Sequence, residues 1–199
     1  MKKEAIFINC PFDEDYRPLL NVLLFSIRYY NLKPLISSLD SDAIQNRLSK
    51  IEKMVKSSQY SIHDLSRMKS TRANEYYRMN MPFELGMDYG MCGPQKKFLI
   101  FESEPHSIAP ALSDINGWDI FYHKSDAQKL LEQLRKWIVA NDSNLDERMK
   151  VMSSEDLWFF YNDFQTILGK FKKSHHFKES EISIKEYIGQ IDKYLRYRK

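Results

Sequence analysis

Short apolar segments alternate with amphipathic helical patterns over most of the chain, and this alternation restricts the fold more than any single motif does. Five segments have the composition of buried strands: Ala5–Ile8, Lys33–Ile36, Tyr60–Ile62, Lys97–Phe101 and Trp118–Tyr122. Most of them are separated by apolar residues three or four positions apart, the spacing of a helix with one buried face. Because parallel strands need such crossovers, the pattern predicts an α/β protein with a doubly wound parallel sheet. We expect a flavodoxin-like strand order over residues 1–140.

The chain beyond residue 140 follows a different pattern. Residues 141–148 are polar and typical of a linker. Two apolar stripes follow, Leu157–Leu168 and Ile184–Leu195, and each is broad enough to need covering. We therefore predict a second region, 141–199, in which a linker leads to a C-terminal α-helical hairpin. The hairpin is expected to pack on the sheet domain, or to bind a partner protein or a second copy of the chain.

Composition excludes several classes of protein. With 199 residues, 43% of them hydrophobic, the chain can bury one sizeable core and a small appendage. A net charge of +3 is too small to argue for nucleic-acid binding, which we do not expect. Cys10 and Cys92 belong to no cysteine or histidine cluster, so neither a disulfide scaffold nor a metal site is expected. No apolar run approaches the ~18 residues of a membrane span, and we expect a cytoplasmic protein without membrane contact.

Common nucleotide-binding and hydrolase motifs are missing from the sequence. No glycine-rich dinucleotide fingerprint follows the first strand, and no P-loop occurs. The chain also has neither a GxSxG elbow nor an HExxH motif. The chemistry that remains is chemistry performed by carboxylates, for which we expect no metal and no cofactor.

The most informative stretch of the chain is Arg78–Met87. Pro82 suits an early helical position, where its missing N–H is not needed. Asn80 or Met81 would be the N-cap, and Glu84 would lie in the first turn, near the positive end of the helix. A carboxylate there, at the mouth of an α/β sheet, is suited to be a nucleophile or to stabilise a cation in glycosyl chemistry. The alternative is that Glu84 only supports the helix N-terminus.

Topology brings other polar residues to the same place. Ligands of doubly wound sheets bind beyond the carboxyl ends of the strands, where the strand order reverses. In the flavodoxin-like order this point lies between the first and third strands, so the loops Asn9–Asp13 and His63–Arg67 meet there, beside the start of the predicted helix. This placement predicts a small-molecule pocket. Its polar residues are expected to be Asn9, Asp64, Arg67, Asn80 and Glu84.

Several of these residues also have a purely structural interpretation. Asp64 can cap a turn or pair with Arg67, and Arg67 can hold an anionic ligand or only the carboxylate of Asp64 or Glu84. The short amide of Asn9 can simply close its loop. Cys10 is expected to be a small buried hydrophobe, because no neighbouring base activates its thiol.

Three segments resemble the sequence blocks of one family. Phe7–Asp13, His63–Arg67 and Asn80–Gly86 are similar to blocks of bacterial TIR-like proteins, a group that is itself similar to nucleoside 2-deoxyribosyltransferases. The resemblance covers the sheet domain and not the helical tail. Its most specific part is the Phe-Glu-Leu-Gly helix start at Phe83–Gly86, which follows an aspartate-bearing strand end.

The resemblance implies a catalytic role for Glu84. In the deoxyribosyltransferases a glutamate of the matching helix is the nucleophile at the sugar C1′. In TIR enzymes a glutamate supports cleavage of the nicotinamide–ribose bond of NAD. The Asp-x-Gly-Thr run of the deoxyribosyltransferases is replaced here by Arg78–Pro82, so their sugar-hydroxyl contacts do not carry over. Similar proteins often occur as effectors of bacterial anti-phage systems, and the resemblance implies that context.

We therefore predict an enzyme that cleaves N-glycosidic bonds, either an NAD glycohydrolase or a nucleoside or nucleotide glycosidase or transferase. NAD would be a substrate rather than a cofactor, and Glu84 is the expected catalytic residue. Asp64 and Arg67 would orient ribose or phosphates, and Asn9 and Phe12 would line the base pocket. The expected substrate-binding residues are Asn9, Phe12, Asp64, Arg67 and Asn80. The alternative is a non-catalytic module of a TIR-like type that senses a nucleotide or assembles into oligomers.

Overall fold

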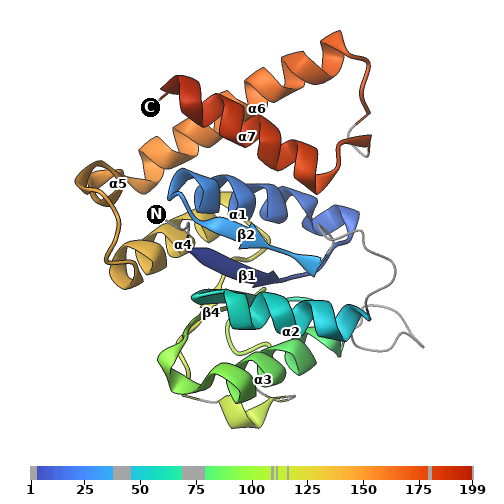
Figure 1. Cartoon of the computed structure of the whole chain (residues 1–199), viewed down its shortest axis with the longest axis vertical. Helices are drawn as coiled ribbons and strands as arrows, with labels where there is room; N and C mark the ends of the chain where they lie inside the picture. Colours follow the sequence, from blue (N-terminus) through green and yellow to red (C-terminus); the bar gives the residue numbers. More distant parts are fainter. Residues whose placement is uncertain are drawn as a thin grey trace.

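A five-stranded parallel sheet runs through the middle of the protein (Figure 1). The computed structural model describes residues 4–37, 46–68, 79–108, 110, 112–115, 117–178 and 181–198. The strands are β1 (Ala5–Asn9), β2 (Lys33–Leu35), β3 (Tyr60–Asp64), β4 (Lys97–Glu102) and β5 (Ile120–Tyr122). Their spatial order is β2-β1-β3-β4-β5, and every neighbouring pair is parallel. This confirms the predicted flavodoxin-like, doubly wound α/β fold.

Helices cover both faces of the sheet. The helices of one face are α1 (Arg17–Tyr29) and α4 (Ala127–Asn141), and those of the other are α2 (Arg47–Ser57) and α3 (Asn80–Cys92) (Figure 1). Ile6 and Ile8 of β1 belong to the core that contains α1. Phe7, between them, packs with Ile51 and Val55 of α2. Because strand side chains alternate between faces, a strand buried on both faces is a continuous apolar run in the sequence.

The connection from β4 to β5 departs from the usual helical crossover. Its described residues contain one turn of 3-10 helix, Ser113–Ile115, and no α-helix. The α3 side of β4 and β5 therefore has no α-helix of its own. A small separate hydrophobic cluster forms there among Leu85 of α3, Ile100 of β4 and Ile108 of the loop.

The C-terminal helices form a third layer of helices, which packs against α1. They are α5 (Glu147–Val151), α6 (Ser154–Ser174) and α7 (Ile184–Arg198), and α6 and α7 lie on the outer side of α1 (Figure 1). The ring of Phe25 on α1 stacks on Phe164 of α6, with centroids 5.5 Å apart, and lies 6.1 Å from Tyr194 of α7. Nε of Arg28 on α1 donates to Asp192 of α7 at 2.8 Å. The predicted helical hairpin thus packs on the sheet domain.

The segment 141–148, predicted as a linker, contains the end of α4 and the start of α5. Asp146 caps α5 by accepting a hydrogen bond from N of Met149 (2.8 Å). Leu145 and Met149 are buried and belong to the same core as α1. Within the described part of the chain, no helix is long and apolar enough to cross a membrane.

We expect Phe164→Ala to lower the free energy of unfolding by about 3–5 kcal/mol, the usual cost of removing a buried phenylalanine ring. Phe164 lies where α1, α6 and α7 meet and is buried. Urea denaturation followed by circular dichroism measures the change. The matched control is Phe159→Ala on the same helix, since Phe159 is 67% exposed and its loss should cost less than ~0.5 kcal/mol. Equal costs for the two variants would contradict the packing of α6 on α1.

Candidate active site

The side-chain amide of Asn9 joins three elements at the carboxyl end of β1. Its Nδ2 donates to Nδ1 of His63 on β3 (3.0 Å) and to the backbone carbonyl of Met81 in α3 (2.8 Å). All three residues are buried, and the sheet register pairs Asn9 with His63. The first strand, the third strand and the start of the Glu84 helix therefore meet at the point where the topology predicts a pocket.

Helix α3 begins one residue earlier than the capping pattern predicts. Its N-cap is Met79, which makes no side-chain capping bond, and its first residue is Asn80, which is exposed. The prediction that Asn80 or Met81 caps the helix is therefore wrong. An N-cap side chain contributes only about 1 kcal/mol, and the tertiary contacts of α3 outweigh it. Pro82 is an early helical residue as predicted, but Glu84 is the fifth and lies just beyond the first turn.

Glu84 carries a buried carboxylate with few partners. The residue is 6% exposed, and none of the described residues donates a hydrogen bond to it. The one described cation that pairs with it is Arg47, at the start of α2, whose Nη2 lies 3.8 Å from Oε1 and so beyond hydrogen-bond distance. Burial raises the pKa of Glu84, and the positive charge of Arg47 opposes that shift. A positive charge arriving beside this carboxylate would be stabilised by it.

Asp64 is fully buried and is held by three donors. Oδ2 accepts hydrogen bonds from Oη of Tyr16 (2.5 Å) and from Nε2 of His123 (3.1 Å), and Oδ1 accepts one from N of Ser66 (2.9 Å). Since N of Ser125 donates to Nδ1 of His123 (2.9 Å), the proton of that ring is on Nε2. Burial and the charge of Asp64 raise the pKa of Tyr16. Asp64 therefore caps its turn, and both its oxygens are engaged within the protein.

Arg67 pairs with Asp13, and with neither of the two carboxylates that the sequence suggested. Its Nη2 lies 3.1 Å from Oδ1 of Asp13. The same oxygen accepts a hydrogen bond from N of Tyr16 (3.0 Å), so Asp13 also caps the 3-10 turn that begins α1. Phe12 is 41% exposed, and the Arg67 side chain is 39% exposed. Phe12 and Arg67 thus lie at the surface, on the loops that follow β1 and β3.

Cys10 lies among these carboxylates. It is buried, as predicted for a small hydrophobe. Burial raises the pKa of its thiol, and the negative charges of Asp64, Glu84 and Asp13 raise it further. One side chain is therefore within electrostatic range of carboxylates from three separate segments. The hydrogen bonds of Asn9 and the pair of Arg67 with Asp13 bring the same three segments together.

A second buried cluster lies behind the contact between β1 and α3, and sequence reasoning missed it. Asp88 of α3 accepts three hydrogen bonds: from Nε2 of His63 (3.1 Å), Oγ of Ser61 (2.5 Å) and Nζ of Lys96 (2.9 Å). Burial raises the pKa of Asp88, but these hydrogen bonds outweigh it and the net pKa is lowered. Burial lowers the pKa of His63, in keeping with a neutral ring. The sequence signal for this cluster was an aspartate four residues after Glu84, on the same face of a largely apolar helix.

His63 and Asp64 are neighbours on β3, but they belong to buried polar clusters on opposite faces of the sheet, because strand side chains alternate between faces. His63 points to the side of α2 and α3, where it meets Asp88. Asp64 points to the side of α1 and α4, where it meets Tyr16 and His123. Two buried histidine–aspartate pairs therefore lie on opposite faces of the sheet, both at its carboxyl edge.

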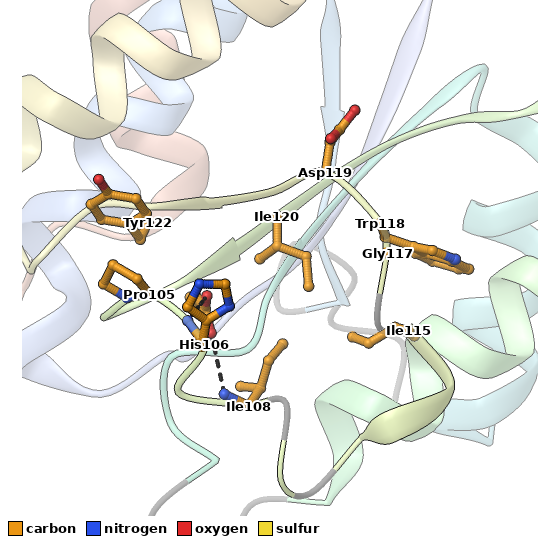
Figure 2. A pocket seen from close by; sticks show the side chains of 10 residues that line it. Pro105, His106, Ile108, Ile115, Gly117, Trp118, Asp119, Ile120 and Tyr122 are labelled. Atoms are coloured by element: carbon orange, nitrogen blue, oxygen red, sulfur yellow. Dashed lines mark hydrogen bonds between the residues drawn. The ribbon is translucent and has the colours of Figure 1, made fainter.

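A cavity of about 350 Å³ lies farther along the sheet, beside β5 (Figure 2). Glu102 at the end of β4 and Tyr122 of β5 are part of its wall. None of the residues predicted for the active site lines it. In the described ranges, no group of three or more histidine, cysteine, aspartate or glutamate side chains is placed to hold a metal ion.

The fold and the site define a flavodoxin-like α/β protein with a buried, sparsely partnered glutamate at the switch point of its sheet. A scan of the chain against protein-family models finds no match, and a search of curated proteins finds none either.

We expect Lys96→Met to lower the free energy of unfolding by about 3–5 kcal/mol, because it leaves the buried carboxylate of Asp88 without its cation. Nζ of Lys96 also donates to the carbonyl of Val55 (2.9 Å) and to Oγ of Ser58 (2.8 Å). The control is Lys97→Met, since Lys97 is the exposed neighbour. Adding Asp88→Asn to Lys96→Met should recover part of the loss. Equal urea midpoints for the two lysine variants would contradict this account.

Proposed function

We propose that the protein cleaves the N-glycosidic bond of NAD, a nucleoside or a nucleotide, with Glu84 as its catalytic carboxylate. One observation carries the proposal. Glu84 is buried at the switch point of the sheet, no described residue donates a hydrogen bond to it, and the one described cation that pairs with it is 3.8 Å away. Cleavage of an N-glycosidic bond builds positive charge on C1′ of the sugar. A carboxylate in these surroundings is suited to stabilise that charge.

The proposed reaction breaks the bond between C1′ and the base nitrogen, and the electron pair leaves with the base. Glu84 then either shields the oxocarbenium ion or attacks C1′ to form a glycosyl intermediate. Water or a second base takes the glycosyl group and frees the carboxylate. Hydrolysis and base exchange thus share the first step and differ only in the final acceptor.

The neighbouring residues would divide into positioning and contact roles. The two N–H bonds of the Asn9 amide are used within the protein, so Asn9 would position α3 rather than line the base pocket. Phe12 and Arg67 are partly exposed and would contact the base and the ribose or phosphates. Asn80 is exposed at the start of α3 and would contact the sugar side of the substrate. Asp64, with its three donors, would support the floor of the pocket.

The resemblance of three segments to TIR-like proteins and deoxyribosyltransferases supports the same reaction. It is compatible with NAD or a nucleoside as the substrate, and with a reaction that needs no cofactor. It also supports a role as an effector in bacterial anti-phage defence.

We expect wild-type protein to release free base from NAD or from one member of a panel of nucleosides and nucleotides. Glu84→Gln should lower kcat/KM by at least about 100-fold, since it removes the charge that stabilises the transition state. Chromatography of the released base measures the rate. Glu155→Gln, an exposed glutamate at the start of α6, is the control and should keep full activity.

Full activity of Glu84→Gln would refute the proposed mechanism. No release from any compound, with a nucleotide recovered intact from the protein, would instead support the alternative of a nucleotide-sensing module. No base release, together with size-exclusion behaviour that depends on protein concentration and is unchanged in Glu84→Ala, would point to an assembly module.

We expect the acid limb of the kcat/KM profile to lie above the usual pKa of glutamate, about 4.3. Burial raises the pKa of Glu84, and the ionised form is the active one, so activity is lost as the pH falls through the raised pKa. Arg47 opposes the shift, so Arg47→Gln should move the limb to still higher pH. Lys56→Gln, at the other end of α2, should leave it in place. A limb that moved to lower pH in Arg47→Gln would contradict this assignment.

A further inference from the structure

The cavity beside β5 occupies the place where a crossover helix would normally cover the sheet. The described residues between β4 and β5 contain one 3-10 turn and no α-helix, and a space of about 350 Å³ is left between loop and strand. That volume is within the usual range of small-molecule sites, ~300–1,000 Å³. Its lining comprises Glu102, Pro105, His106, Ile108, Ile115, Gly117, Trp118, Asp119, Ile120 and Tyr122.

The floor of the cavity is formed by alternate residues of β5 and the residues just before it. Figure 2 shows Trp118 at one end and Tyr122 at the other, with Ile120 between them. The side chain of Asp119 points away from this row, as strand alternation requires (Figure 2). Two aromatic rings and an aliphatic side chain therefore offer an apolar floor.

Glu102 contributes a negative charge to the wall of the cavity. The residue is 3% exposed. Its carboxylate accepts hydrogen bonds from N of His106 (2.7 Å), Oγ of Ser107 (3.0 Å) and N of Ile108 (3.2 Å). All three donors are neutral amide or hydroxyl groups, and no lysine, arginine or histidine of the described chain forms an ion pair with Glu102. Buried carboxylates are normally paired with a cation, and no residue in the part of the chain that the structure describes supplies one here.

We propose that this cavity binds a small organic cation with an apolar body, such as an amidinium or ammonium group on an aromatic or aliphatic frame. The cationic group would face Glu102, where a charge-assisted hydrogen bond is available. The apolar body would lie on Ile120 between the two aromatic rings, which also attract cations through their faces. Tyr122 already shows this property, because Nζ of Lys129 lies 4.0 Å from the centre of its ring.

The site is separate from the mouth that contains Glu84, and its ligand is independent of the proposed glycosidic reaction. No residue predicted for catalysis or substrate binding lines the cavity. The connections between the two places are structural: Ile108 packs in one hydrophobic cluster with Leu85 of α3, and N of His123, whose side chain binds Asp64, donates to the carbonyl of Glu102 (3.2 Å). A binding experiment can therefore test the cavity without any assumption about the reaction.

The probe pair is benzamidine and benzamide, which have nearly the same shape and differ in charge at neutral pH. Isothermal titration calorimetry on the full chain should show benzamidine binding at least about tenfold more tightly than benzamide. Glu102→Gln should abolish that preference while keeping the size of the side chain. Glu104→Gln, an exposed glutamate of the same loop, is the matched control and should preserve it.

Two further variants test whether the probes bind in this cavity or at another acidic site of the protein. Ile115→Trp introduces a larger side chain from the loop side and should weaken both probes, with circular dichroism to show that the fold persists. Glu84→Gln should leave benzamidine binding unchanged. The proposal is overturned if benzamidine gives no binding heat, if both probes bind equally, or if the preference survives in Glu102→Gln. It is also overturned if the preference is lost in Glu84→Gln, because the cation would then lie at the mouth.

Discussion

The two N–H bonds of one amide hold the mouth of the sheet together. Asn9 uses one of them on His63 of β3 and the other on the carbonyl of Met81 in α3. A side-chain amide has no other donors, so Asn9 has none left for a ligand. Behind it, His63 continues the hydrogen-bonded chain to Asp88, which ties α3 to β3 at a second point. Helix α3 is thereby fixed to both strands that border the switch point.

Helical spacing then determines where Glu84 lies. It follows Met81 by three residues and precedes Asp88 by four, so the three residues share one face of α3. That face is turned to the sheet, because Met81 and Asp88 both bond to strand side chains. Glu84 is buried because the contacts of Met81 and Asp88 hold this face of α3 against the sheet, and not because of hydrogen bonds of its own. A rotation of α3 that exposed its carboxylate would break both anchors.

The features that the sequence predicts here are those with a local signal. Apolar runs and helical stripes were enough to place the strands, their order and the meeting of the loops around Asn9 and Glu84. The partners of Asp64 were out of reach, because His123 is 59 residues away and arrives through the registers of β3, β4 and β5. The start of α3 was displaced because a local capping preference competes with tertiary contacts. The sequence gives no sign that Glu102 lacks a partner cation among the described residues, because this depends on all the residues that pack around its carboxylate.

Five carboxylates are buried among the described residues, and four of them, those at or near the carboxyl edge of the sheet, differ in how completely their charge is compensated. Asp64 and Asp88 are sealed from solvent and accept hydrogen bonds from histidine, and Asp88 also has a lysine. Among the described residues, Glu84 has one arginine, 3.8 Å away, and Glu102 has only neutral donors. Burying a charge without a close counter-charge costs stability, and such costs are concentrated where a ligand or transition state supplies the missing charge. Asp64 and Asp88 are well compensated, whereas Glu84 and Glu102 are not. This contrast is the physical reason for proposing a cationic transition state beside Glu84 and a cationic ligand beside Glu102.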